Sequence, residues 1–475
     1  MSKNLEPKAL WSHFADLNSV PRPSKKEERI IQFMVDFGNS LGLETQVDEI
    51  GNVIIRKPAT EGMEKRKTIV LQGHLDMVHQ KNNDTQFDFN SQGIDMYIDG
   101  DWVKAKGTTL GADNGLGVAA IMAVLSSKDL AHPAIEALFT IDEETGMTGA
   151  KELKGNLLTG EILLNLDTEE DDEIGIGCAG GVDISATKSY QEVSVNYDAI
   201  GYTIKVKGLQ GGHSGMDIIK ELGNANKIMN RILFEVSKTC KMQISSLEGG
   251  SLRNAIPRES ITNLVLPKTE DDKFLEEVKK RIDEIKTEFK SLEPNLDISA
   301  KPSELLEKVM SVGDQDLFLK AVYATHNGVY RMSPDVPGLV ETSNNIAKII
   351  VHNGTIHIEC LTRSSSETNK RDLSNAIAAT LEMAGFEVSF SGDYPGWLPN
   401  VESPILKSLV DTYKKLFQSD PNVAACHAGL ECGILGQHYP NMDMISFGPN
   451  IKGAHSPDER AQISSSQKFW KLLTE

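Results

Sequence analysis

The sequence predicts an α/β protein in which a mixed-sheet domain is interrupted by an inserted α+β domain. Strand-like runs alternate with helical patterns up to about residue 178, which is typical of a parallel or mixed sheet covered by helices. The pattern then changes to alternating strands and charged helices, and the first pattern returns after residue 393. A chain of 475 residues is also too long for one ordinary core. We therefore expect a discontinuous domain, residues 1–181 and 394–475, and an inserted domain, residues 182–393.

Local patterns predict the elements of the inserted domain. Residues 348–361 (KIIVHNGTIHIECL) predict a hairpin, because Asn353-Gly354 suits a tight type I′ turn between two alternating strands. Strand-like segments are expected at 202–209, 260–267, 295–302 and 386–392, and helices at 222–236, 272–289 and 370–385.

Composition restricts the class of partner. Hydrophobic residues make up 39% and charged residues 25% of the chain, as in soluble globular proteins. The formal net charge of −19 disfavours nucleic acids and anionic membranes as partners. No apolar run is long enough to span a membrane, and the first residues lack the apolar core of a signal peptide. The five cysteines form no CxxC pair, so we expect reduced thiols and a cytoplasmic location.

Four strand-like runs end on histidine or carboxylate side chains. The run from Thr68 ends on His74, and a second run ends on Glu143 and Glu144. A third ends on Asp167, and the fourth leads into a loop with His455. Such groups are costly to bury without partners. In an open α/β sheet, ligands bind beyond the carboxyl ends of the strands, so we expect these side chains to converge there.

Two further segments are predicted to start helices near this site. In GTTLGADNGLGVAAIMAVL, Asp113 or Asn114 can cap a helix, which places Asp113 at a helix start facing the same crevice. Residues 456–459 (SPDE) are typical of an N-cap and a proline-led first turn. We therefore expect His455 to lie directly before a helix.

The converging side chains predict a metal site. Two histidines and at least three carboxylates in one crevice would repel one another unless cations neutralise them. Mixed nitrogen and oxygen ligands suit zinc, manganese or cobalt better than calcium. The carboxylates are too many for one open tetrahedral ion, whereas two ions about 3.5–4 Å apart would use them all. Each residue alone is more often structural, so the prediction depends on their joint placement.

The motifs HLD, GADNG, DEETG, NLDTEE and GAHSPDE occur in this order. In these motifs, the chain resembles the co-catalytic dizinc aminopeptidases and dipeptidases. Among these enzymes it resembles the aminoacyl-histidine (Xaa-His, carnosinase-like) dipeptidases, and the resemblance covers nearly the whole chain. The resemblance implies zinc-dependent hydrolysis of the peptide bond in dipeptides, preferentially Xaa-His. It also implies small peptides as substrates and a homodimer formed through the inserted lid domain.

The resemblance assigns a role to each residue of the site. A metal-bridging water would be activated by Glu143 as general base. Asp76 would orient His74, in agreement with its place two residues along an extended chain, where it can accept the N–H of a metal-bound imidazole. The metal ligands implied are His74 and Asp167 for one zinc, Glu144 and His455 for the other, and Asp113 as the bridge.

The resemblance also implies functional residues in and after the inserted domain. His213, in LQGGHSG, would be a turn histidine by local sequence alone. The resemblance implies instead that it reaches the active site of the partner subunit and polarises the scissile carbonyl. Asn254 and Arg363 would bind the substrate backbone and carboxylate, and Gly429 would supply backbone contacts. The other histidines are expected to be structural or at the surface: His13, His79, His132, His326, His352, His357, His427 and His438.

Two alternatives stand beside the dipeptidase. A related dizinc tripeptidase or an N-acyl amino-acid deacylase would use the same metal site on another amide. A non-catalytic metal- or nucleotide-binding protein belongs to a different class. Glu143 argues against this second alternative, because a metal carrier needs no base beside its ligands.

Overall fold

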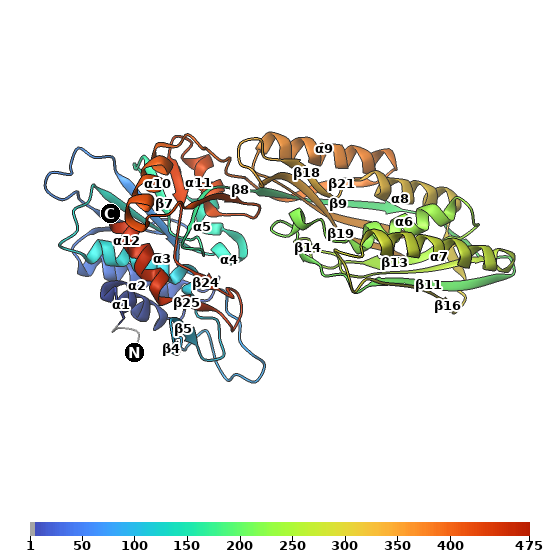
Figure 1. Cartoon of the computed structure of the whole chain (residues 1–475), viewed down its shortest axis with the longest axis horizontal. Helices are drawn as coiled ribbons and strands as arrows, with labels where there is room; N and C mark the ends of the chain where they lie inside the picture. The colour runs from blue at the N-terminus through green and yellow to red at the C-terminus, as the bar shows by residue number, and fades with distance from the viewer. Residues whose placement is uncertain (1–4) are drawn as a thin grey trace. The chain divides into compact units, whose positions relative to one another are not determined.

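The computed structural model describes residues 5–475, which form two compact units (Figure 1). The first unit contains the residues up to Gly177 together with Trp397–Ala425 and Leu430–Glu475. The second contains Cys178–Gly396 and Cys426–Gly429. The predicted α/β class is confirmed, since the first unit is built on a mixed sheet flanked by helices.

The first unit is organised around an eight-stranded sheet with the order β1-β2-β6-β3-β7-β23-β8-β22. Strand β3 pairs parallel with β6 and β7, and β7 pairs parallel with β23, whereas β2 is antiparallel to β1 and β6, and β8 is antiparallel to β23. The apolar runs of β3 and β6 are buried, as expected for central strands covered on both faces. The strands are β1 (Glu44–Val47), β2 (Val53–Lys57), β3 (Ile69–His74), β6 (Ile135–Thr140), β7 (Ile162–Asn165), β8 (Glu173–Cys178), β22 (Asn422–Cys426) and β23 (Asp443–Ser446).

Helices cover this sheet, and a small four-stranded sheet of order β24-β25-β5-β4 lies beside it. Helix α3 is apolar on all sides and almost wholly buried, which is typical of a helix inside a core. In the described part of the chain, no helix is long and apolar enough to cross a membrane. The elements are α1 (Lys8–Asn18), α2 (Glu28–Ser40), α3 (Ala112–Ser126), α4 (Glu143–Gly146), α5 (Thr148–Glu152), α10 (Pro404–Phe417), α11 (Glu431–His438), α12 (Ile463–Thr474), β4 (Met96–Asp99), β5 (Trp102–Ala105), β24 (Ile451–Lys452) and β25 (Arg460–Gln462).

The second unit has a nine-stranded antiparallel sheet, in which eight strands have the order β16-β11-β15-β13-β19-β20-β9-β21 and the ninth, β18, pairs with β19. The predicted hairpin is confirmed: His352 pairs with Thr355, and Asn353 and Gly354 both have the positive φ of a type I′ turn, 48° and 76°. The strands are β9 (Gly180–Ser189), β11 (Ala199–Lys207), β13 (Gln243–Gly249), β15 (Ser260–Pro267), β16 (Asp297–Ser303), β18 (Gly328–Met332), β19 (Val340–His352), β20 (Thr355–Ser364) and β21 (Glu387–Tyr394). Two-stranded pairs are formed by β10 (Glu192–Ser194) with β17 (Lys308–Met310), and by β12 (Gly212–His213) with β14 (Ala255–Ile256).

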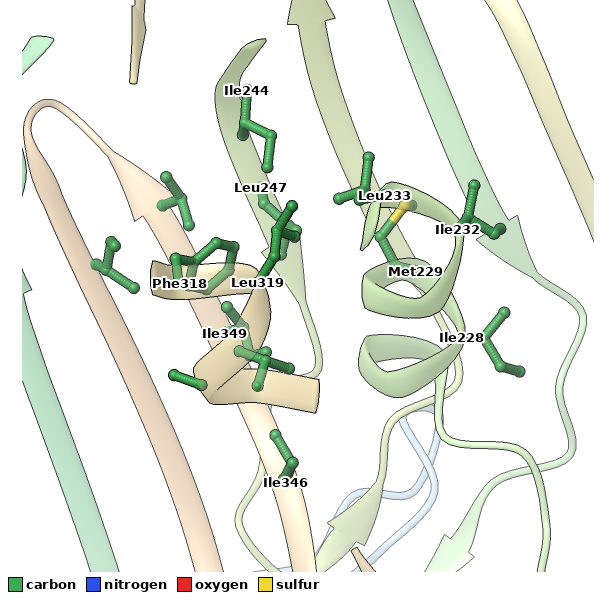
Figure 2. Packing of buried hydrophobic residues seen from close by; sticks show 14 of the residues in the cluster. Ile228, Met229, Ile232, Leu233, Ile244, Leu247, Phe318, Leu319, Ile346 and Ile349 are labelled. Carbon is green, nitrogen blue, oxygen red and sulfur yellow. The ribbon is translucent and has the colours of Figure 1, made fainter. Parts of the chain in front are cut away.

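Four helices pack on this sheet through one hydrophobic core. Met229 and Leu233 of one helix and Phe318 and Leu319 of another belong to the same cluster as Ile244 and Ile349 of the strands (Figure 2). Helix α6 (Ala225–Ser237) has its apolar residues at helical spacing on one face, which explains why that face is buried. The helices are α6 (Ala225–Ser237), α7 (Asp271–Glu288), α8 (Val312–Ala324) and α9 (Glu367–Met383).

Candidate metal centre

The candidate metal centre lies at the carboxyl ends of the parallel strands of the first unit. His74 is the last residue of β3, and Glu143 and Glu144 begin the short helix α4 after β6. Asp167 follows β7, and His455 lies beyond β23, in the loop between β24 and β25. Because β3, β6, β7 and β23 run in the same direction, their ends meet at one edge of the sheet.

Asp113 lies between two histidines and offers a different oxygen to each. Its Oδ1 is 3.2 Å from Nε2 of His74, and its Oδ2 is 3.2 Å from Nε2 of His455. On the first side, Oδ1 of Asp167 is 3.6 Å from the same nitrogen of His74. On the second side, Oε2 of Glu144 is 3.0 Å from His455 Nε2. The five side chains therefore form two histidine–carboxylate sets that share Asp113, and we call them the metal cluster.

The donor atoms of the metal cluster fit divalent cations. Ligand atoms of His74, Asp113 and Glu144 all lie within 4.8 Å of one another. Oε1 of Glu144 and Oδ1 of Asp167 are buried, and neither has a hydrogen-bond partner among the described residues. Buried carboxylate oxygens normally have a partner, and a cation would supply one here. Imidazole and carboxylate ligands suit zinc and similar transition metals.

The charges of the cluster are strongly coupled. Burial, together with Asp113 and other acids, raises the pKa of Glu144 and of Asp167. The hydrogen bonds that His455 donates to the carboxylates of Asp113 and Glu144 raise the pKa of His455 to about 11. Burial alone would lower the pKa of His74, but Asp167, Asp113 and Asp76 outweigh it and raise this pKa well above 6.5. Without metal, protonated imidazoles thus balance the acids, which is the role that bound cations would take.

Asp76 connects His74 to the turn that carries the two glutamates. Its Oδ1 lies 3.4 Å from Nδ1 of His74, on the side of the ring away from Asp113. The backbone N–H groups of Glu143 and Glu144 donate to its carboxylate at 3.0 and 3.3 Å, and the Ser24 hydroxyl donates at 2.8 Å. Burial opposes ionisation of Asp76, but its hydrogen bond and charge interaction with His74 hold its pKa below 3.8.

Glu143 is placed next to the cluster by the same turn. Burial raises its pKa well above 4.5, with further contributions from the charges of Asp167, Glu431 and Glu144, while His74 acts in the opposite direction. A carboxyl group with a raised pKa accepts and releases protons closer to neutral pH than an ordinary glutamate does. Glu143 is thus electrostatically suited to acid–base chemistry.

The structure confirms that a helix starts at Asp113, because α3 begins at Ala112, but it contradicts the predicted side-chain cap and the second predicted helix start. No side chain caps α3 from Asp113 or Asn114, whose backbone is not helical. Residues 456–459 do not begin a helix: Ser456 closes a turn with Gly453 and Asp458, β25 follows, and α12 starts only at Ile463. The reason is that the Glu459 side chain binds the backbone at the start of α3 instead of forming a helix of its own. Its buried carboxylate accepts hydrogen bonds from the backbone N–H groups of residues 110–113 and so replaces a local cap for α3.

Two more buried charges support the site and were missed by the sequence analysis. Arg22 donates to the carbonyl groups of Leu75 and Asp76 at 3.1 and 3.0 Å. Glu431 accepts hydrogen bonds from the Gln72 amide and the Thr140 hydroxyl, both at 2.7 Å, just before the strand ends that carry the cluster. Burial raises the pKa of Glu431 to about 7. These contacts span 53 to 359 residues, so no local sequence pattern could indicate them.

The four predicted substrate residues lie in the second unit. His213 ends β12, and the N–H of the next residue, Ser214, donates to the carbonyl of Asn254 at 2.8 Å. Arg363, on β20, is 5% exposed; its Nη1 donates to the Tyr394 hydroxyl at 2.6 Å, and its Nε has no hydrogen-bond partner in the described residues. Gly429 belongs to the short segment that returns to this unit.

His427, expected to be structural or at the surface, is buried in this same region. Its Nε2 lies 2.7 Å from the Ser343 hydroxyl, and its Nδ1 has no hydrogen-bond partner within residues 5–475. Burial, Arg363 and His213 lower the pKa of His427 to about 3. His213, Arg363 and His427 therefore interact electrostatically.

Comparison with known proteins reveals relatives that match almost the entire chain. The sequence profile of peptidase family M20/M25/M40 matches residues 70–475. The sequence is 42% identical to the cytosol non-specific dipeptidase of Escherichia coli (strain K12), over 471 residues that cover 99% of this chain and 97% of the relative.

Solved structures agree with this result. The aminoacylhistidine dipeptidase from Vibrio alginolyticus matches with a TM-score of 0.95 at 43% identity, covering 100% of this chain and 97% of the other. The aminopeptidase PepT from Bacillus cereus matches with a TM-score of 0.57 at 15% identity, covering 99% of this chain and 97% of the other. At such low identity, this second likeness concerns the fold alone.

Proposed function

Because the chain belongs to peptidase family M20/M25/M40, we propose that it is a metallodipeptidase that hydrolyses dipeptides, preferentially Xaa-His. The observation that carries the proposal is the position of Asp113 between the two histidine–carboxylate sets. The names of the relatives that are 42% and 43% identical support the dipeptide substrate. The Vibrio relative, named for aminoacylhistidine dipeptides, supports the Xaa-His preference.

We propose two divalent ions per chain, with zinc as the first choice and manganese or cobalt as alternatives. His74 and Asp167 would hold one ion, and Glu144 and His455 the other. Asp113 would bridge them, since each of its oxygens faces a different imidazole. Asp76 would fix the ring of His74, because a metal-bound histidine commonly donates its other N–H to a carboxylate.

The chain's own residues would carry out the proton transfers. When bound, divalent ions lower the pKa of water and polarise the carbonyl of a peptide bond. Glu143 would accept the proton of the attacking water and return it to the amide nitrogen as the peptide bond breaks. Burial beside other acids raises the pKa of Glu143, which favours the uptake of a proton by its carboxylate.

Substrate recognition is assigned to the second unit. The Arg363 guanidinium would pair with the free carboxylate of a dipeptide, for which it has an unused buried Nε. Asn254 and Gly429 would bind the peptide backbone, and His213 would stabilise the oxyanion that develops on the carbonyl. We further propose that the enzyme is cytoplasmic, in keeping with the name of the Escherichia coli relative, and forms a homodimer through the second unit.

A panel of peptides tests this function. The purified enzyme should hydrolyse dipeptides, with Xaa-His among the best, and should lose activity to a chelator and regain it with added zinc. Tripeptides and N-acyl amino acids in the same panel represent the two hydrolase alternatives, and faster turnover of either would replace the dipeptidase assignment. Arg363→Ala should chiefly raise KM for free dipeptides, with less effect on carboxyl-amidated ones, because only the former present a carboxylate.

A further inference from the structure

The turn that carries His213 directs two backbone donors at one nitrogen of its imidazole. The backbone N–H groups of Gly215 and Met216 both donate to Nδ1 of His213, at 3.2 and 3.1 Å. A ring nitrogen that accepts hydrogen bonds carries no proton. These two contacts fit a neutral imidazole with its one proton on Nε2.

Asp217 closes this turn around His213. Its Oδ2 accepts a hydrogen bond from the backbone N–H of His213 at 2.7 Å, and its own N–H donates to the His213 carbonyl at 3.0 Å. Its other oxygen, Oδ1, is paired with Nζ of Lys220 at 2.6 Å. The carboxylate is thus tied to the backbone of His213 by one oxygen and to an outer lysine by the other.

The turn is also closed from the opposite side. A Cβ atom at Gly215 would lie 2.0 Å from the carbonyl oxygen of His427 and 3.2 Å from Cε1 of His213. Only glycine allows the backbone to approach this closely, which brings the Gly215 N–H within reach of the ring. The charges around the ring agree with a neutral state, because burial and Arg363 lower the pKa of His213 while Asp217 opposes them only in part.

We infer that Asp217 is a positioning residue that, with the N–H groups of residues 215 and 216, presets His213 as a neutral hydrogen-bond donor through Nε2. The inference rests on the proposed function, in which His213 stabilises the oxyanion. In this state Nε2 donates a hydrogen bond at once and cannot act as a base. Because the turn fixes the proton before substrate binds, no tautomer change is needed during the reaction.

Nitrogen NMR of the full-length holoenzyme with ¹⁵N-labelled histidine tests the protonation state without substrate. The His213 signals are those that disappear in His213→Gln. We expect an unprotonated Nδ1 and a protonated Nε2 in the wild-type enzyme, and a mixture of tautomers in Asp217→Ala. Lys220→Ala is the matched control, because it removes the partner of Oδ1 and leaves the bond to the His213 N–H.

Kinetics separate positioning from a structural role. Asp217→Ala should lower kcat by about 10- to 100-fold with little change in KM, as expected when a catalytic group is displaced. Asp217→Asn retains an acceptor oxygen and should restore most of kcat, and Lys220→Ala should match the wild type.

A protonated Nδ1 in the wild-type enzyme would overturn the inference even if Asp217→Ala failed to fold. If Asp217→Ala changed neither the tautomer of His213 nor kcat, Asp217 would not be a positioning residue. The expected NMR pattern in an enzyme that cleaves no dipeptide would instead count against the proposed function alone.

Discussion

The carboxylate of Glu459 is bound to the backbone of the loop that carries Asp113. Its two oxygens accept hydrogen bonds from the N–H groups of residues 110–113, at distances of 2.6 to 3.3 Å. Glu459 lies four residues after His455 in the chain. One buried side chain therefore ties together the two loops that supply Asp113 and His455 to the metal cluster.

Glu459→Gln should weaken metal binding although Glu459 contacts no metal in our proposal. Glutamine offers one acceptor oxygen instead of two, and its amide N–H groups would face backbone donors. We expect the affinity of the metal-free protein for zinc, measured by calorimetry, to fall by about 10- to 100-fold, as for other residues that hold metal ligands in place. Asp458→Asn removes the neighbouring carboxylate without touching these bonds and should bind zinc normally. Equal affinities for both variants would contradict a positioning role for Glu459.

The residues brought together at the strand ends could be predicted because each follows a recognisable local pattern. The apolar run before His74 is a buried strand, and parallel strands deliver their ends to one edge. The hairpin at Asn353 was predictable for the same reason, since its turn chemistry is local.

The groups that support the cluster could not be predicted in this way. Glu459 stabilises a backbone about 350 residues away, and its sequence context, Ser-Pro-Asp-Glu, is typical of a helix start that does not form. Arg22 and Glu431 likewise act through long-range contacts that only the folded chain creates. At these positions long-range contacts outweigh the local preference for secondary structure, because burying an unpartnered charge costs more free energy than losing a helical turn.

The shared position of Asp113 predicts how many ions each variant retains. The wild-type protein should contain about two divalent ions per chain, the number expected for a co-catalytic site. Asp167→Ala should keep the ion on the His455 side, whereas Asp113→Ala removes a ligand from both sides and should lose both. Elemental analysis after dialysis measures this directly. If Asp113→Ala kept both ions and full turnover, Asp113 would not be the bridge.

Glu143 and Glu144 are adjacent but should respond differently to the same substitution. Glu143→Gln keeps the size of the side chain and removes the base, so kcat should fall by about 10²–10⁴-fold with nearly unchanged metal content. Glu144→Gln should instead weaken metal binding, because Glu144 Oε2 lies beside His455 in the cluster. Metal content and kcat of both variants should be measured on the same preparations. Exchanged phenotypes would mean that the two roles are reversed.

Burial of neutral His427 predicts a pH-dependent stability. The pKa of His427 is about 3 in the folded protein and 6.5 in the unfolded chain. Between these values only the unfolded state binds the proton, so the free energy of unfolding must fall as the pH falls below 6.5. At pH 5 the loss relative to pH 7.5 is about 2 kcal/mol, at about 1.4 kcal/mol for each pH unit.

Urea denaturation of wild-type protein and His427→Gln at the two pH values measures this difference. The wild type should lose about 2 kcal/mol more than the variant on going from pH 7.5 to pH 5. His352→Gln, which replaces an exposed histidine in the same unit, should follow the wild type. Parallel pH profiles for wild type and His427→Gln would mean that folding does not lower the pKa of His427.

The proposed dimer can be tested by mixing two inactive variants. His213→Ala lacks the oxyanion donor and Glu143→Gln lacks the base, so each homodimer should be nearly inactive. If His213 serves the metal cluster of the partner subunit, a mixed dimer contains one site with both defects and one with neither. Mixing and subunit exchange should then restore activity, approaching one quarter of the wild-type level per chain, because about half of the dimers are mixed and each has one intact site.

If His213 serves its own chain, every site in a mixed dimer retains one defect and no activity returns. Exchange must be followed independently, for example by native mass spectrometry of a tagged variant, so that absence of recovery places His213 in its own chain's site or outside catalysis.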